Sequence, residues 1–209
     1  MKRIEELQSM ADEEILLLCK EANDETVRKC VEILARRYET AILNYIYRII
    51  RDREAAEDLT QETFVRVFNK SRQFKKVAKF STWLYKIATN LSLNEIRDRK
   101  IRPSLTLYAQ AQQDADAGDL VSLLPAPHIP AETDSQRREL ALLIENTLQE
   151  LPEKYRLVLV LCDIEQFSYR EAARVLGMRV GTVGSRLSRA RRYFVEKFKP
   201  HIQEKEGSS

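Results

Sequence analysis

The residues best suited to chemistry in this sequence are arginines that recur near its C-terminus. Arg186, Arg189 and Arg192 follow one another at intervals of three, which places them on one face of a helix. Arginine can fork onto guanine edges in the DNA major groove, at about 1–3 kcal/mol per contact, or hold phosphates without reading sequence. The alternative is an ordinary amphipathic helix with a solvated basic face. The residues that we expect to meet DNA on this face are Thr182, Ser185, Arg186, Ser188, Arg189 and Arg192.

The residues before this face predict a helix-turn-helix, with the arginines on its second helix. Ser168 and Glu171 have the spacing of a capping box at the start of the first helix. Gly177 can take the left-handed conformation of the turn, and Val183 begins the buried stripe of the second helix. Gly184 is awkward, because glycine inside a helix costs about 1 kcal/mol relative to alanine and supplies no side chain to the groove. We therefore expect the base pair that faces Gly184 to be read weakly.

The sequence predicts neither a catalytic centre nor a metal or cofactor site. Cys19, Cys30 and Cys162 follow no CxxC pattern and sit among apolar neighbours. We expect them to be small buried hydrophobes, the alternatives being redox sensing and metal binding. The two histidines, His128 and His201, lie beside a proline and in the C-terminal tail, so they suggest no ligand cluster. We expect no cofactor, no small-molecule substrate and no enzymatic activity.

Charge is distributed unevenly along the chain, although the formal net charge is only +3. Residues 103–134 are acidic, contain several prolines and hold no lysine or arginine, which is typical of a flexible linker. They separate a unit at 10–102 from a second unit at 135–200. The predicted fold class is all-α, with two helical domains joined by a flexible acidic linker and a helix-turn-helix in the C-terminal domain.

Apolar residues at spacings of three and four predict the helices of both units. One helix is expected to begin at Ser81, a suitable N-cap, and Pro152 suits the first turn of another. Neither a signal peptide nor a segment of transmembrane length is recognisable, so we expect a cytoplasmic protein. The other expected helices cover residues 12–20, 27–50, 53–69 and 135–150 and the two arms of the helix-turn-helix.

Four segments in order resemble the small two-domain, sigma-70-like sigma factors of bacterial RNA polymerase, of the extracytoplasmic-function type. They read AEDLTQETF at 56–64, FSTWLYKIATN at 80–90, LPEKYR at 151–156 and VGTV followed by SRL at 180–187. The resemblance covers almost everything outside the linker and the tail. Gly184 departs from it, because relatives often have a basic or polar residue there.

The resemblance implies that the chain binds core polymerase and directs initiation at promoters through their −35 and −10 elements. The unit at 10–102 would contact the β′ clamp helices and melt the −10 element, while the unit at 135–200 would bind the −35 element near the β flap. The linker would run through the polymerase near the RNA path. An anti-sigma factor, often membrane-bound, is a further implied partner.

The resemblance also assigns residues. Those implied at the polymerase interface are Asp58, Gln61 and Glu62, for which composition alone favours a solvated helix face. Lysines of the segment 73–79 suit phosphate contacts, and Phe74 offers a surface for an unstacked base. The residues implied at the −10 element are Phe74, Lys75, Lys76, Lys79, Asn90, Asn94 and Arg97.

Two other functions remain open at this point. A helix-turn-helix regulator could bind operator DNA without entering polymerase, but it leaves the segments around Asp58 and Trp83 unexplained. A protein-binding adaptor would use the basic helix only as a solvated face, and salt-dependent DNA binding would count against it.

Overall fold

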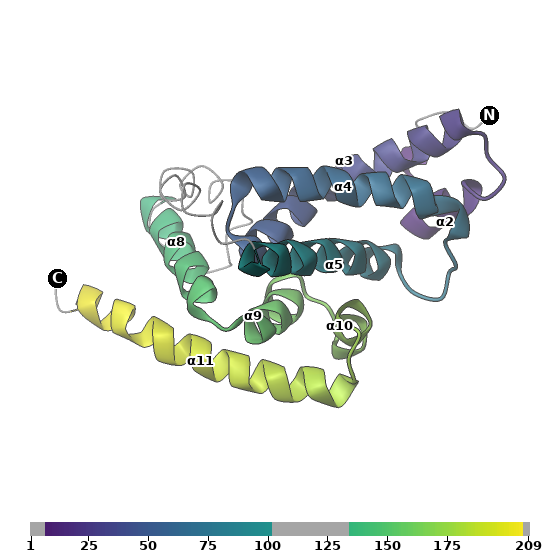
Figure 1. Ribbon diagram of the computed structural model, residues 1–209. Helices are drawn as coiled ribbons and strands as arrows, with labels where there is room; N and C mark the ends of the chain where they lie inside the picture. Colours follow the sequence, from purple (N-terminus) through teal and green to yellow (C-terminus); the bar gives the residue numbers. More distant parts are fainter. Residues whose placement is uncertain (1–6, 102–133, 207–209) are drawn as a thin grey trace.

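The regular elements of the protein are helical throughout the part of the chain that the structure, a computed structural model, describes: residues 7–101 and 134–206 (Figure 1). The helices of the first part are α2 (Asp12–Leu18), α3 (Asp24–Ile50), α4 (Arg53–Lys70), the 3-10 turn η1 (Ser71–Gln73) and α5 (Phe80–Ile101). Those of the second part are α8 (Asp134–Glu150), α9 (Glu153–Leu159) with a π-helical turn (Val160–Ile164), α10 (Tyr169–Leu176) and α11 (Val180–Glu206).

The all-α fold class is confirmed over these ranges. The expected flexible linker at 103–134 lies outside the described residues, except that residue 134 opens α8. His128 lies outside them too, and the side chain of His201 is not described. No helix within the described ranges is both long and apolar enough to span a membrane.

Local capping sets several helix boundaries. The Asn23 side chain accepts a hydrogen bond from the Thr26 amide at 2.9 Å, and the Asp52 side chain accepts one from the Ala55 amide at 3.0 Å. Such caps satisfy amide groups that the first turn leaves without a helical partner. Arg51, with a left-handed φ of 51°, ends α3 directly before the Asp52 cap of α4.

The expected N-cap at Ser81 is wrong. Helix α5 begins at Phe80, so Ser81 lies inside its first turn. The Phe80 amide donates instead to the carboxylate of Glu13, a residue of α2, at 2.7 Å. The side chain of Glu13, distant in sequence, therefore caps the first turn of α5. Pro152 also differs slightly from its expected place in the first turn, because it is the N-cap residue of α9.

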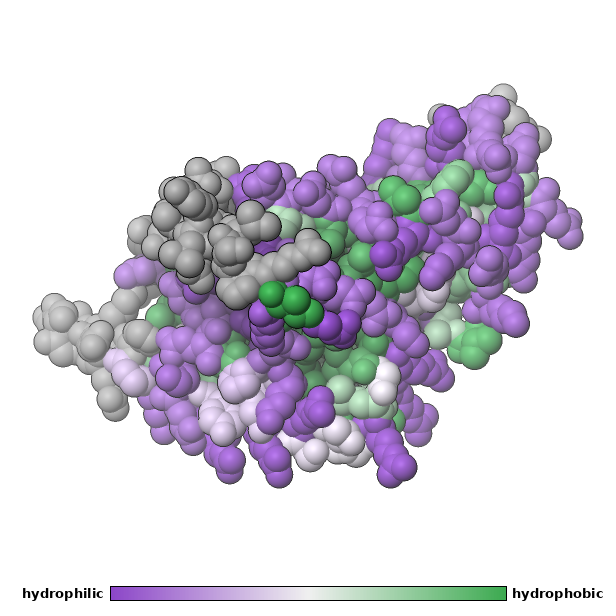
Figure 2. Space-filling model, in the orientation of Figure 1, coloured by the Kyte–Doolittle hydropathy of each residue, from purple (hydrophilic) through white to green (hydrophobic). Residues whose placement is uncertain are grey.

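In the N-terminal part, α3, α4 and α5 pack lengthwise and α2 lies across one end (Figure 1). The centre of this core is apolar and fully buried, as Ile42, Tyr45 and Leu84 show. The three cysteines are buried, as predicted. In the C-terminal part, α11 runs along α8, α9 and α10, and hydrophilic side chains cover most of the face seen in Figure 2.

The two parts pack directly on each other, a contact that the sequence did not indicate. Helix α10 lies against α5 (Figure 1). The rings of Tyr85 and Phe167 meet with their centroids 4.8 Å apart, and the Tyr85 hydroxyl donates to Glu165 at 2.6 Å. Arg48 of α3, whose side chain is 4% exposed, binds Glu145 at 2.8 Å and Glu165 at 3.3 Å. Burial raises the pKa of Glu165, although Tyr85 and Arg48 oppose that shift.

The burial of Arg48 between two carboxylates predicts a large stability effect. We expect Arg48→Ala to lower the free energy of unfolding by about 3–5 kcal/mol, because it leaves buried carboxylates without their cation. The matched control is Arg36→Ala on the same helix, whose pair with Glu32 is exposed. We expect that control to lose only about 0.3–0.5 kcal/mol. Urea denaturation measures both, and similar losses in the two variants would contradict the prediction.

Candidate nucleic-acid interface

A short loop at 74–79 joins η1 to α5 and is closed at its base by aromatic packing. Phe74 and Phe80 are 4% and 0% exposed. Their ring centroids lie 5.4 and 6.2 Å from that of Trp83. The expectation that Phe74 presents an open surface to an unstacked base is therefore wrong for this structure, because its ring is a core side chain. Phe74 instead anchors one end of the loop.

The loop between these anchors is cationic and exposed. Lys75 and Lys76 are exposed, and the Val77 amide donates to the Lys75 carbonyl at 2.6 Å in a tight turn. Val77 is 77% exposed. The sequence analysis missed this residue, although its position between Lys76 and Lys79 in a polar loop would have indicated an exposed side chain. Lys79 is held differently, because its Nζ lies 2.9 Å from Oε1 of Glu171 in α10.

A row of polar side chains continues from the loop along α5. Asn90, Asn94 and Arg97 are all exposed, and Arg97 Nη1 donates to Asn94 Oδ1 at 3.2 Å. Their spacing places them on one helix face. Lys86, also exposed and one turn before Asn90, extends the row and was not predicted, although its spacing of four from Asn90 would have indicated it.

The predicted polymerase contact lies on the outer face of α4. Asp58 and Gln61 are exposed, and Glu62 is half-buried and accepts a hydrogen bond from Arg66 at 2.7 Å. Val65, one turn beyond Gln61, is 51% exposed. The face therefore combines acidic and amide groups with one exposed apolar side chain.

The predicted helix-turn-helix is present as α10 and α11. The Glu171 amide donates to the Ser168 hydroxyl at 3.3 Å, and the Ser168 amide donates to the Glu171 carboxylate at 3.0 Å, which together form the capping box. The Ser168 hydroxyl also donates to the same carboxylate at 2.6 Å. Gly177 takes the left-handed conformation, with φ at 64°, and the Met178 amide donates to the Ala173 carbonyl at 3.0 Å. The local sequence signals for the turn are confirmed.

Helix α11 buries one stripe and exposes the other, as its sequence predicts. Val183, Leu187 and Ala190 are buried on the side of α11 that packs against the other helices of the C-terminal part. Arg191 is engaged by a fork of hydrogen bonds to Asp163, at 2.6 and 2.9 Å. The predicted DNA-facing residues divide into the exposed Ser185, Ser188, Arg189 and Arg192 and the half-buried Thr182 and Arg186.

Position 184 adjoins a tyrosine. A Cβ at Gly184 would lie 3.7 Å from Cε2 of Tyr169, the first residue of α10. Tyr169 is 44% exposed, so its ring lies beside α11 where a side chain at 184 would begin. The sequence analysis missed Tyr169, because only the packing of α10 on α11 brings it there.

Comparison with known proteins identifies the family. Residues 34–101 match the family model for sigma-70 region 2, and residues 141–193 match that for sigma-70 region 4. The RNA polymerase sigma-H factor of Pseudomonas aeruginosa is 31% identical over 182 residues, which cover 85% of this chain and 90% of that protein. The ECF RNA polymerase sigma factor SigW of Bacillus subtilis is 36% identical over 154 residues, which cover 74% and 81%. This chain belongs to the ECF sigma factors.

Solved structures agree on the fold. CnrH in complex with the cytosolic domain of CnrY has a TM-score of 0.63 at 22% identity, covering 91% of this chain and 99% of that one. The Bartonella quintana sigma factor RpoE, solved with the anti-sigma factor NepR, has a TM-score of 0.57 at 24% identity, covering 80% and 96%. ECF sigma factors are not an enzyme class. In this sigma factor the lysine loop lies within region 2 and the helix-turn-helix within region 4.

The capping box of this sigma factor predicts a pH dependence. The Ser168 hydroxyl, and then Lys79, lower the pKa of Glu171 from 4.5 to about 2. Because the folded value is the lower one, the stabilisation is complete above pH 4.5 and is lost as the pH falls towards 2. We expect Ser168→Ala to raise the pKa of Glu171, as followed by NMR of its carboxylate. An unchanged titration in Ser168→Ala would exclude the hydroxyl as the cause.

The two glycines at and after the turn predict stability changes of opposite sign. Gly184→Ala should raise the free energy of unfolding by about 0.5–1 kcal/mol, because the helix interior favours alanine and its methyl meets Tyr169 only at contact distance. Gly177→Ala should lower it, because alanine is strained at a φ of 64°. Thermal unfolding of both variants checks this, and changes of the same sign would contradict it.

Proposed function

We propose that this sigma factor binds core RNA polymerase and directs promoter-specific initiation through −35 and −10 elements. The observation that carries the proposal is the presence, in one chain, of two different cationic surfaces. One is a lysine loop followed by the polar row of α5, and the other is the arginine face of a helix-turn-helix. The first suits a single strand and the second suits a duplex groove. We assign them to units at 10–102 and 135–200, with 103–134 as linker.

The arginine face of α11 would read the −35 duplex. Arg189 and Arg192 are exposed, and Arg186 lies half-buried one turn before Arg189. Loss of a base-reading arginine relaxes preference at one position, whereas loss of a phosphate contact weakens all sequences and lowers the salt slope by about one. Tyr169, beside Gly184, is positioned to add a contact from α10.

The lysine loop and α5 would capture the −10 non-template strand. Lys75 and Lys76 suit its phosphates, while Val77 and Asn90 supply an apolar surface and an amide for an unstacked base. Lys79 can join them once it exchanges the Glu171 carboxylate for a phosphate. Binding of a flipped base stabilises melted DNA without a chemical step.

The outer face of α4 would dock on the β′ clamp helices of polymerase through Asp58, Gln61 and Glu62, with Val65 adding apolar contact. The C-terminal unit would lie near the β flap. The proposed setting is the cytoplasm, where polymerase acts. An anti-sigma factor is a further proposed partner, because the similar sigma factor RpoE was solved in complex with the anti-sigma factor NepR.

A regulator that binds operator DNA alone would use the helix-turn-helix but has no use for the α4 face. The decisive experiment is therefore reconstitution with core polymerase and transcription from a promoter library. Initiation at a defined set of promoters supports the proposal. Operator binding without transcription would favour the regulator instead.

The polymerase contact makes a specific prediction. Asp58→Lys with Glu62→Lys should reduce affinity for core polymerase at least tenfold, because charge reversal at an interface opposes both attraction and steering. Helical content should be unchanged, because Asp58 is exposed and the Glu62 side chain is 44% exposed, so neither substitution places a charge in the core. Fluorescence anisotropy with labelled sigma factor measures the affinity.

The matched control is Glu21→Lys with Glu39→Lys, two exposed acids outside α4 that give the same change in net charge. We expect this control to bind core polymerase normally. If the α4 double variant binds as well as the control, the polymerase contact lies elsewhere.

A further inference from the structure

The lysine loop, residues 74–79, is flanked at both ends by residues that are hydrogen-bonded to the segment 12–24, which contains α2 and the first residue of α3. At its exit, the loop joins α5 at Phe80, whose amide is bound by Glu13. At its entry, Arg72 donates to the Ala22 carbonyl at 3.0 Å and to Asp24 at 2.6 Å. The loop is therefore not positioned by its own sequence alone.

The exit tie lies at the point where the loop becomes helix. Glu13 Oε1 lies 2.7 Å from the amide nitrogen of Phe80, the first residue of α5. The first amides of a helix have no partner in the helix and carry the positive end of its dipole, so a carboxylate there is favourable on both counts. Glu13 thus fixes a backbone group one residue after Lys79.

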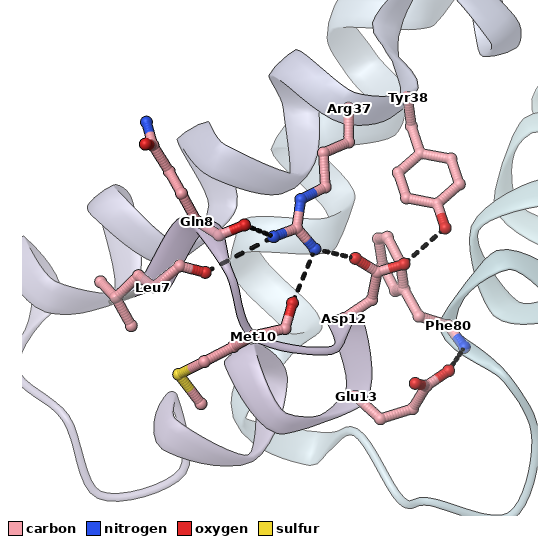
Figure 3. A network of polar contacts seen from close by, with 8 residues as sticks. All are labelled: Leu7, Gln8, Met10, Asp12, Glu13, Arg37, Tyr38 and Phe80. Carbon is pink, nitrogen blue, oxygen red and sulfur yellow. Dashed lines mark hydrogen bonds and ion pairs between the residues drawn. The ribbon is translucent and has the colours of Figure 1, made fainter. Parts of the chain in front are cut away.

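Glu13 is itself held in place by its neighbour in sequence (Figure 3). Asp12 accepts hydrogen bonds from Arg37 and from the Tyr38 hydroxyl, both on α3. The Tyr38 ring meets the Phe80 ring edge-on, with centroids 5.3 Å apart and planes at 83°. Two contacts therefore hold Phe80. Glu13 binds its amide, and the ring of Tyr38, whose hydroxyl donates to Asp12, packs against its ring.

The same network secures α2 as a whole. Arg37 also donates to the backbone carbonyls of Gln8 at 2.6 Å and Met10 at 3.0 Å (Figure 3). The backbone before α2 is thus hydrogen-bonded to α3, and α2 cannot shift without breaking these contacts. That rigidity is what allows Glu13 to define the position of a distant amide.

The entry tie is weaker. The side chains of Arg72 and Asp24 are 49% and 76% exposed, and water screens an ion pair of that kind. Glu13 is half-buried and acts on a helix terminus, where the dipole adds to the hydrogen bond. The exit tie therefore controls the loop more strongly than the entry tie.

We propose that Glu13 is a positioning residue for capture of the −10 strand: its bond to the Phe80 amide holds the loop lysines in the geometry that receives the unpaired bases. The inference rests on the proposed function of the loop. Without the bond, the first turn of α5 can fray, and Lys79 and the preceding turn lose their fixed direction. Glu13 does not touch DNA.

The test uses the full chain assembled with core polymerase, on a promoter chosen from the library with the wild-type protein. The variants are Glu13→Ala, Glu13→Gln and the control Glu14→Ala, an exposed neighbour on α2 with the same charge change as Glu13→Ala. The measurements are affinity for core polymerase, melting temperature, open-complex formation by permanganate footprinting, and affinity of holoenzyme for the single-stranded −10 oligonucleotide of that promoter.

We expect Glu13→Ala to weaken binding of the oligonucleotide and open-complex formation about tenfold, equivalent to about 1.4 kcal/mol. Affinity for core polymerase should stay within twofold, and Glu14→Ala should match the wild type in every measurement. Glu13→Gln keeps a side-chain oxygen that can accept the Phe80 amide, so it should recover most of the lost strand binding. A merely structural role would not produce this selective loss and recovery.

Two results would overturn the inference. One is strand binding by Glu13→Ala equal to that of Glu14→Ala. The other is a parallel loss of strand binding, affinity for core polymerase and melting temperature, which would make Glu13 a general stabilising residue. Failure of the wild-type protein to open any promoter would instead overturn the proposed function.

Discussion

The arrangement of the described parts depends on one buried cation. Arg48 lies in the last turn of α3, and its buried guanidinium binds Glu145 of α8 and Glu165 next to α10. A charge removed from water must be compensated, and these carboxylates come from the other part of the chain. The cation therefore makes the two parts mutually dependent, and the contacts of Tyr85 with Glu165 and Phe167 surround the same point.

The packing of the two parts also brings the lysine loop next to the helix-turn-helix. With α10 against α5, Lys79 of the loop reaches Glu171, which also completes the capping box of the helix-turn-helix. One carboxylate thus serves the start of the first arm and restrains the lysine loop. A phosphate bound at Lys79, as proposed, would compete with that carboxylate and would thereby couple binding at the loop to the surroundings of α10.

The sequence indicated those features that depend on neighbours along the chain. The capping box at Ser168, the turn at Gly177 and the buried stripe from Val183 follow from local hydrogen bonding and helical spacing, and the structure has all of them. Features that depend on distant contacts could not be read in this way. Phe74 has a ring that could stack on a base, but that ring is buried beside Trp83. Ser81 is a residue type that often caps helices, but the helix begins one residue earlier and Glu13 binds the first amide.

The two surfaces also differ in which cation they use, and the difference follows from their supports. The loop carries lysines, compact charges on flexible stems that follow the phosphates of a strand without fixed geometry. Helix α11 carries arginines, whose planar forks need a rigid support before two hydrogen bonds can meet one base edge. A helix held by Val183 and Leu187 supplies that rigidity. The loop obtains its geometry from its ends, through the packing of Phe74 on Trp83 at one end and the Glu13 carboxylate on the Phe80 amide at the other.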